Sequence, residues 1–285
     1  MVMEKLELKW ESTAPFVLNL HLTKACNMNC IFCFGGFKEA KTRLSQADWE
    51  RLIRKIGKET AHLPRRRINF AGGEPLLVPY LSELIQVAYE EGFEVSLITN
   101  GSRLSRSFIQ EHRGYLQMIG ISIDSLDPVL NQASGRTVQG KSLNLNDYLM
   151  RCKWVKEAGL TLKVNTLIHQ FNAHQDFHPL LNAVSIDRWK ILRMLAIENE
   201  NGDSKHWLPT DEAFYGFVRR HQSFSPVVEN DDEIQQSYLF VSPEGYLMDN
   251  QTGDMENGLN LLHHSLGVAI QHLNFRQEAY NKRYL

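Results

Sequence analysis

Six strand-like runs that alternate with helix-length segments are the feature that most constrains the fold of this 285-residue chain. The runs lie at residues 16–23, 67–72, 94–100, 118–124, 160–168 and 188–195. Strands that are separated by a helix pair in parallel through right-handed crossovers. We therefore expect an α/β fold of six β/α units, arranged as an open or closed barrel.

Helical patterns fill the spaces between these runs. Residues 45–59 begin with a capping box at Ser45. Residues 78–92 and 145–159 each end at a glycine, which suits the left-handed cap of a helix. Residues 210–222 are predicted to form a further capped helix.

The pattern changes after about residue 225. A hairpin is predicted in "SYLFVSPEGYLMD" (237–249), followed by a final amphipathic segment at 259–273. We interpret residues 1–15 as a lead-in, 16–225 as the barrel, and 226–285 as an extension that packs on the barrel and closes its site.

Composition excludes several classes of protein. The net charge of −2 gives no general attraction to nucleic acid or to an anionic membrane. No apolar run approaches the roughly 18 residues of a membrane-spanning helix, and the first residues, "MVMEKLELKWES", have no signal-peptide core. We expect a cytoplasmic monomer with no membrane anchor and no nucleic-acid partner.

Polar residues share one side of each predicted strand. Side chains alternate along a strand, and the apolar side must lie under the helices of a barrel. The other side then turns into the barrel interior, where it places Asn19, His21, Thr23, Asn69, Ser122, Asp124, Lys163, Asn165, Arg188 and Lys190. Such an interior suits a polyanion. Each residue alone has an ordinary structural explanation, such as a satisfied core histidine or a lysine that extends to water.

Three of the four cysteines, Cys26, Cys30 and Cys33, lie within eight residues just after the first strand. Cysteine thiolates hold iron–sulfur clusters, and three ligands on a four-iron cluster leave one iron open for a cofactor. A structural zinc site completed by His21 or by a distant histidine is an alternative, although no second C-x2-C pair exists. Three unligated thiols are another alternative. Cys152 lies in a helical pattern and is expected in the core.

"CNMNCIFC" resembles the C-x3-C-x-aromatic-C motif of the radical S-adenosylmethionine (radical SAM) enzymes, with Phe32 at the aromatic position. "FAGGEP" (70–75), "ITNG" (98–101) and "SIDS" (122–125) resemble further motifs of that family, in the same order. The resemblance implies a partial (β/α)6 barrel, a 4Fe–4S cluster and S-adenosylmethionine as cofactors, and an electron donor of the flavodoxin or ferredoxin type. Consecutive glycines also let the backbone approach a ligand closely.

"SGRTVQGK", "LKVNTLIHQFN", "RWKIL" and "SYLF" extend the resemblance to the viperin family over most of the chain, in its short prokaryotic form. The resemblance implies the following roles. Cys26, Cys30 and Cys33 would ligate the cluster, and Phe32, Phe34, Gly72, Gly73, Glu74, Pro75, Asn100 and Ser122 would bind the cofactor. Asn19, Arg136, Lys163, Asn165, Arg188 and Lys190 would hold the nucleotide, with Tyr238 and His21 at the reacting ribose.

The activity implied is the dehydration of a nucleoside triphosphate (CTP, UTP or GTP). A 5′-deoxyadenosyl radical takes the ribose 4′ hydrogen, and loss of the 3′ hydroxyl gives the 3′-deoxy-3′,4′-didehydro nucleotide, a chain terminator in antiviral defence. Two alternatives stay open: a radical SAM enzyme for another small molecule, and a zinc-binding nucleic-acid module. The base would be selected near residues 246–260, for which no spacing rule exists.

Overall fold

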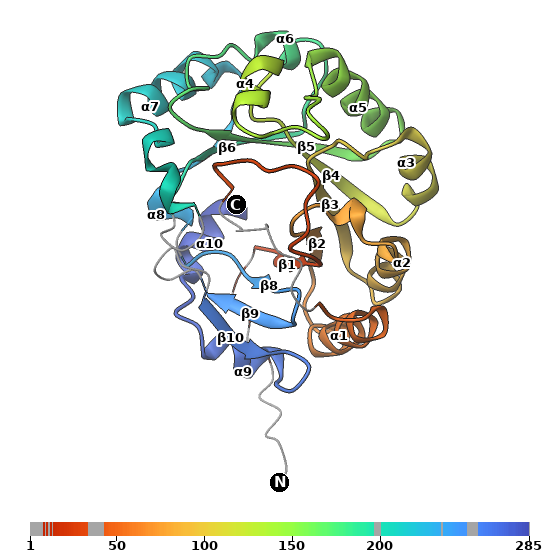
Figure 1. Cartoon of the computed structure of the whole chain (residues 1–285). Helices are drawn as coiled ribbons and strands as arrows, with labels where there is room; N and C mark the ends of the chain where they lie inside the picture. Colours follow the sequence, from red (N-terminus) through yellow and green to blue (C-terminus); the bar gives the residue numbers. More distant parts are fainter. Residues whose placement is uncertain are drawn as a thin grey trace.

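The computed structural model describes residues 8, 10, 12, 14–33, 43–196, 201–234, 236–249 and 256–284. Within this part of the chain, ten strands form one curved sheet in the order β10-β9-β8-β1-β2-β3-β4-β5-β6-β7 (Figure 1). The sheet has two free edges, at β10 and β7, and is therefore a partial barrel. The α/β class and the open-barrel architecture predicted from the sequence are confirmed.

The six predicted strands are present, with ends shifted by two residues or fewer. Neighbours among them pair in parallel. The strands are β1 (Phe16–His21), β2 (Arg66–Ala71), β3 (Glu94–Thr99), β4 (Leu116–Ser122), β5 (Thr161–Ile168) and β6 (Arg188–Arg193). A seventh parallel strand, β7 (Val227–Glu229), adds to β6 and was missed because three residues give too short a pattern.

Helices surround the sheet, on its outer side and at its rim (Figure 1). They are α1 (Gln46–Glu59), α2 (Leu81–Glu90), α3 (Arg106–His112), α4 (Pro128–Ala133), α5 (Leu145–Glu157), α6 (His178–Leu181), α7 (Asp211–Arg220) and α8 (Asp231–Ile234), with short 3-10 turns at Pro75–Leu77, Gly202–Trp207 and Gln222–Phe224. The predicted capping residue Ser45 accepts a hydrogen bond from the Asp48 amide. Gly92 and Gly159 have φ of +80° and +75°, as their positions after helices require.

The predicted sidedness of the strands is confirmed. Leu18, Leu20 and the apolar residues at the same parity in β2 to β6 belong to one core cluster beneath the helices. The polar parity of the same strands faces the barrel interior. Burial of the apolar side stabilises the sheet by about 25 cal/mol per Å², which leaves the inner side available for polar groups.

The strands that follow α8 extend the sheet on the β1 side of the barrel (Figure 1). β8 (Phe240–Val241) pairs in parallel with β1, and β9 (Tyr246–Asp249) pairs antiparallel with β8, so the predicted hairpin is present. The predicted amphipathic segment 259–273 is not one element. It begins in strand β10 (Glu256–Asn260) and becomes helical only at α9 (Leu266–Gln271). The division into a barrel and an extension at 225/226 stays a prediction.

A final helix, α10 (Gln277–Tyr284), follows α9 and was not expected from the sequence. Its Tyr280 hydroxyl donates to the Pro15 carbonyl at 2.6 Å and accepts from the Val17 amide at 2.7 Å. The C-terminal helix is thus tied to the start of the first strand. None of the helices in the described part of the chain is both long and apolar enough to cross a membrane.

Backbone contacts hold the loop that carries the cysteines from two sides. On one side, Gly73 N donates to Thr23 O at 2.7 Å and Glu74 N donates to Ala25 O at 2.9 Å. On the other side, Asn29 N and Ile31 N donate to the carbonyls of Gly135 and Ser134, each at 3.0 Å. A side chain cannot fit at either glycine, because a Cβ atom would lie 2.1 Å from Ala25 O at Gly73 and 2.1 Å from Asn29 O at Gly135.

We expect Gly73→Ala to destabilise the cluster-free protein by about 1–3 kcal/mol, the usual cost of overpacking. Gly114→Ala is the matched control, because a Cβ atom there meets nothing within 4 Å. Urea unfolding of both variants measures the difference. Equal stability of the two variants would contradict the proposed packing of the cysteine loop.

Candidate active site

A cavity of about 320 Å³ lies inside the curved sheet. Its wall brings together the cysteine loop, the inner side of the strands and part of the extension. Of the predicted site residues, it is lined by Asn19, His21, Cys26, Cys30, Phe32, Cys33, Gly72, Gly73, Asn100, Ser122, Arg136, Lys163, Asn165, Arg188, Lys190 and Tyr238. Glu74 and Pro75 do not line it, and Phe34 lies outside the described residues.

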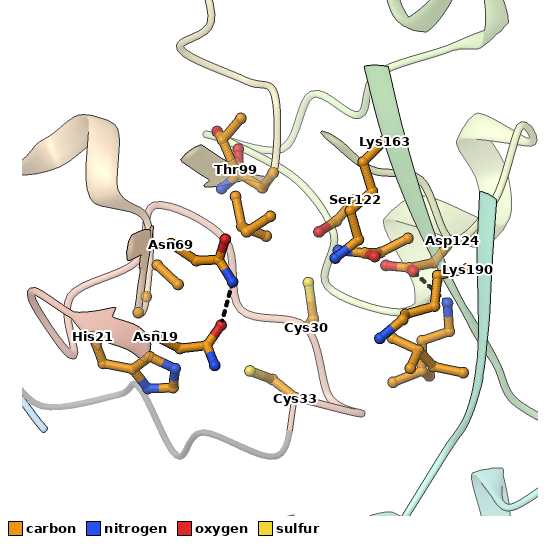
Figure 2. Close-up of a pocket in the computed structure, with 18 of the residues that line it drawn as sticks. Asn19, His21, Cys30, Cys33, Asn69, Thr99, Ser122, Asp124, Lys163 and Lys190 are labelled. Carbon is orange, nitrogen blue, oxygen red and sulfur yellow. Dashed lines mark hydrogen bonds between the residues drawn. The ribbon is translucent and has the colours of Figure 1, made fainter. Parts of the chain in front are cut away.

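Three thiols form one side of the cavity. Figure 2 shows the sulfur atoms of Cys30 and Cys33 between the Asn19–Asn69 pair and the group that contains Ser122, Asp124 and Lys190. None of the three forms a disulfide bond. Burial raises the pKa of Cys26, and it raises the pKa of Cys30 to about 11 although Arg136 opposes the shift. The thiols of Cys26 and Cys30 are therefore protonated without a metal, and binding of a metal centre would release their protons.

The spacing of the thiols does not suit one zinc ion. Ligands of a tetrahedral zinc with bonds of about 2.3 Å stand roughly 4 Å apart. In the described part of the chain, Asp176, His178 and His221 are the group whose ligating atoms all lie within 4.8 Å of one another. The sulfur atoms of the three cysteines do not form such a group. The three thiols around a shared cavity fit a larger cluster instead. A loop held by backbone contacts on both sides supplies these ligands from fixed positions.

Arg136 lies beside the thiols. Its guanidinium group pairs with Asp124 at 2.7 Å, donates to the Ser122 carbonyl, and lies 3.9 Å from Cys30 Sγ. The side chains of Arg136 and Asp124 are almost fully buried. Its predicted contact with the triphosphate stays a prediction, but in this structure Arg136 is engaged on the cysteine side of the cavity.

The motif residues Glu74 and Asn100 are joined to each other. The fully buried Glu74 carboxylate accepts from Thr99 Oγ1 at 2.7 Å and from the Asn100 amide at 2.8 Å. Asn100 Nδ2 lies 3.7 Å from Cys26 Sγ, and it also donates to Asn27 in the cysteine loop. Glu74 therefore acts from behind the wall: it fixes the loop after β3 against the cysteine loop.

Asn19, Asn69 and His21 form the wall contributed by β1 and β2. Asn69 Nδ2 donates to Asn19 Oδ1 at 2.8 Å, and Asn19 Nδ2 donates to the Leu239 carbonyl of the extension at 2.9 Å (Figure 2). Burial lowers the pKa of His21 to about 4. The imidazole is thus neutral near pH 7, and it can form hydrogen bonds without carrying charge.

Three cations form the opposite wall. The register pairs Lys163 with Arg188, and it pairs Asn165 with Lys190, so that two successive rows project from β5 and β6. Burial, together with Lys190 and Arg188, lowers the pKa of Lys163 well below its ordinary value. Asn165 Oδ1 is buried and has no hydrogen-bond donor among the described residues. An anion beside Lys163 would relieve the repulsion between these charges.

Sequence reasoning missed Glu229 and Arg283. Glu229, at the end of β7, pairs with Lys190 and with Arg283 Nε at 2.8 Å. Tyr238 lies between Lys190 and Glu229. Its hydroxyl accepts a hydrogen bond from Lys190 Nζ at 2.8 Å and donates one to Glu229 at 2.5 Å. A single acidic residue after two valines, as at Glu229, forms no recognisable sequence pattern. The single arginine at position 283 forms none either.

The geometry agrees with comparisons to known proteins. The model of the radical SAM superfamily matches residues 20–184, which is more than half of the chain, and this chain belongs to that superfamily. A crystal structure of Streptococcus suis SuiB bound to S-adenosylmethionine shares the fold, with a TM-score of 0.65 at 15% identity over 95% of this chain and 68% of that one.

Within the superfamily, the chain is a member of the family of S-adenosylmethionine-dependent nucleotide dehydratases, to which viperin belongs. A relative of that name from Selenomonas ruminantium is 30% identical over 94% of this chain and 98% of its own. Another, from Lacinutrix mariniflava, is 33% identical over 93% of this chain, which spans only 57% of that protein. The cofactors of a radical SAM enzyme are a 4Fe–4S cluster and S-adenosylmethionine, and the three thiols fit such a cluster.

We expect alanine at Cys26, Cys30 or Cys33 to abolish stable incorporation of iron and sulfide during anaerobic reconstitution, because each thiolate is predicted to be one of three protein ligands. Cys152→Ala is the control, since Cys152 is buried in α5 and does not line the cavity. Iron and sulfide analysis measures the result. Full iron content in any of the three loop variants would show that its thiol is not a ligand.

Proposed function

We propose that this chain dehydrates a nucleoside triphosphate to its 3′-deoxy-3′,4′-didehydro analogue. The observation that carries the proposal is the pairing of two walls across one cavity. One wall presents three thiols, and the other presents Lys163, Arg188 and Lys190. A cluster and a polyanion therefore share one enclosed space. The names of the relatives agree with this activity.

Cys26, Cys30 and Cys33 would hold the cluster. The backbone of Gly72 and Gly73, with Asn100 and Ser122, would hold S-adenosylmethionine next to it, because these residues line the cavity beside the thiols. When bound and reduced, these cofactors supply a 5′-deoxyadenosyl radical that removes the ribose 4′ hydrogen. A donor of the flavodoxin or ferredoxin type would provide the electrons. Cysteines that form no disulfide suit the reducing cytoplasm.

The cation wall would fix the triphosphate. Arg188 offers a planar fork of donors to phosphate, whereas Lys163 offers a point charge. The unpaired oxygen of Asn165 suits a ligand that donates a hydrogen bond, such as a ribose hydroxyl. Contacts at both the triphosphate and the ribose would orient the sugar toward the cysteine side of the cavity. Correct orientation of reacting groups accounts for much of the rate acceleration by an enzyme.

Tyr238 would act as the acid in the dehydration. The C3′–O bond of the substrate radical would break, and the hydroxyl proton of Tyr238 would join the departing hydroxide to form water. One electron from the external donor would then reduce the remaining radical cation to the product with its C3′=C4′ double bond. Neutral His21 would border the sugar without adding charge. The product has no 3′ hydroxyl, so a polymerase cannot extend an RNA chain after it, which supports a role in defence against phage.

Product analysis tests the proposal directly. The reconstituted enzyme is given CTP, UTP, GTP or ATP separately, with S-adenosylmethionine and dithionite under anaerobic conditions. We expect mass spectrometry to find a nucleotide lighter by one water for at least one of CTP, UTP and GTP. If S-adenosylmethionine is cleaved but none of the four nucleotides loses water, the proposed activity is wrong.

Lys163→Ala is expected to weaken triphosphate binding by about tenfold or more, as loss of a buried charged hydrogen bond does, while cleavage of S-adenosylmethionine without nucleotide persists. Lys153→Ala is the control, because Lys153 is exposed on α5. Calorimetry with a nucleoside triphosphate gives the affinity of each variant. Equal affinity in the two variants would remove Lys163 from the binding site.

A further inference from the structure

A buried polar cluster stands at the β6 side of the cavity. It consists of Lys190, Glu229, Tyr238 and Arg283, and we call it the Glu229 cluster. Lys190 and Tyr238 line the cavity, whereas Glu229 and Arg283 lie behind them. The two hidden residues therefore touch no ligand in the cavity directly.

We propose that Arg283 and Glu229 are positioning residues for the dehydration. The C-terminal helix α10 carries Arg283 to Glu229, and Glu229 in turn fixes the hydroxyl of Tyr238 and the ammonium of Lys190. This inference rests on the proposed function, since it assigns Tyr238 to the ribose and Lys190 to the triphosphate.

The contacts of Arg283 are specific. Its Nε donates to Glu229 at 2.8 Å, and Nη2 donates to the Glu233 carbonyl and to Ser237 Oγ, each at 2.6 Å. Nη1 donates to the Ser237 carbonyl. The guanidinium carbon also lies 3.6 Å from the centre of the Tyr238 ring, a close cation–π contact. Arg283 thus holds both Glu229 and the ring of Tyr238.

Charge defines the direction of the Tyr238 hydroxyl. Burial alone would raise the pKa of Glu229, but Lys190 and Arg283 beside it lower that pKa to about 2. An ionised carboxylate only accepts hydrogen bonds, and an ammonium only donates them. The Tyr238 hydrogen must therefore point to Glu229, and its oxygen must accept from Lys190. To donate to a ligand in the cavity, the Tyr238 hydroxyl would rotate about its C–O bond, away from Glu229.

Buried charges such as those of the Glu229 cluster lose their hydration, so they stabilise a fold only weakly. Replacing buried ionic groups by apolar residues of similar volume is often neutral or stabilising. The position of this cluster, against the cavity and not within the apolar core, points to a role in the site. The α10 helix also reaches a second cavity residue, since Arg188 Nη2 donates to the carbonyl of Arg283 at 2.8 Å.

The test compares Arg283→Met with Lys282→Met, its exposed neighbour on the same helix. Both are assayed with saturating nucleoside triphosphate for the ratio of dehydrated nucleotide to 5′-deoxyadenosine, and by calorimetry for triphosphate affinity. We expect Arg283→Met to lower that ratio at least about tenfold, because a misplaced acid loses part of its usual contribution. Affinity should change little, and Lys282→Met should behave as wild type.

An unchanged ratio in Arg283→Met, or an equal fall in Lys282→Met, would overturn the inference. Arg283→Lys, which keeps one charge near Glu229, should restore part of the ratio. Wild-type enzyme that forms no dehydrated nucleotide would instead overturn the proposed function, so the two failures are distinguishable.

Glu229→Gln gives a second test that preserves shape, should Arg283→Met fail to fold. The charged and titratable groups that face Lys190 are Glu229 in β7, Arg283 in α10, Tyr238 before β8, Arg188 in β6 and Lys163 in β5. Burial lowers the pKa of Lys190 to about 8, and Glu229 is the neighbour that opposes the shift. Removing that charge lowers the pKa further, so the loss of dehydration at high pH should begin at lower pH. A profile identical to wild type would contradict the proposed role.

Discussion

The double backbone attachment of the cysteine loop is the constraint on which the rest of the site depends. Without regular secondary structure, residues 24–33 would have no fixed course. The backbones of Gly73 and Gly135 approach the loop from opposite sides, and neither position has room for a Cβ atom. Three thiols are thereby held at one end of a cavity whose other walls belong to the sheet. Each glycine follows a strand or a helix of the barrel, so the barrel determines where the thiols lie.

The interior of the barrel is polar because the apolar side of every strand is used by the helices. This arrangement makes a cavity that a dry core could not provide, and it creates an electrostatic problem. Burial lowers the pKa of Lys163, and repulsion from Lys190 and Arg188 lowers it further. Glu229 neutralises only the Lys190 end of this group. The negative charge of a triphosphate would neutralise the remaining positive charge of this wall. The repulsion between the cations would therefore favour binding of the substrate.

The extension contributes to the site as well as covering it. Leu239 accepts a hydrogen bond from Asn19, Tyr238 reaches Lys190, and Arg283 reaches Glu229. These contacts join residues that are far apart along the chain across the gap between β1 and β6. A partial barrel has free edges, and the extension uses both sides of that gap to enclose the cavity.

The sequence by itself determined the six strands and their inner and outer sides, and it predicted the cysteine ligands, because all of these depend on local patterns with periods of two or three to four residues. It also indicated Lys163, Asn165, Arg188 and Lys190 through strand parity. The assignment of Glu74 to the cofactor stays a prediction, and its buried carboxylate also holds the loop after β3. Only the tertiary structure decided this role, the pairing of Arg136 with Asp124, and the meeting of Glu229 with Arg283. These contacts depend on strand register and on chain segments that meet across the barrel, and no local pattern encodes such distances.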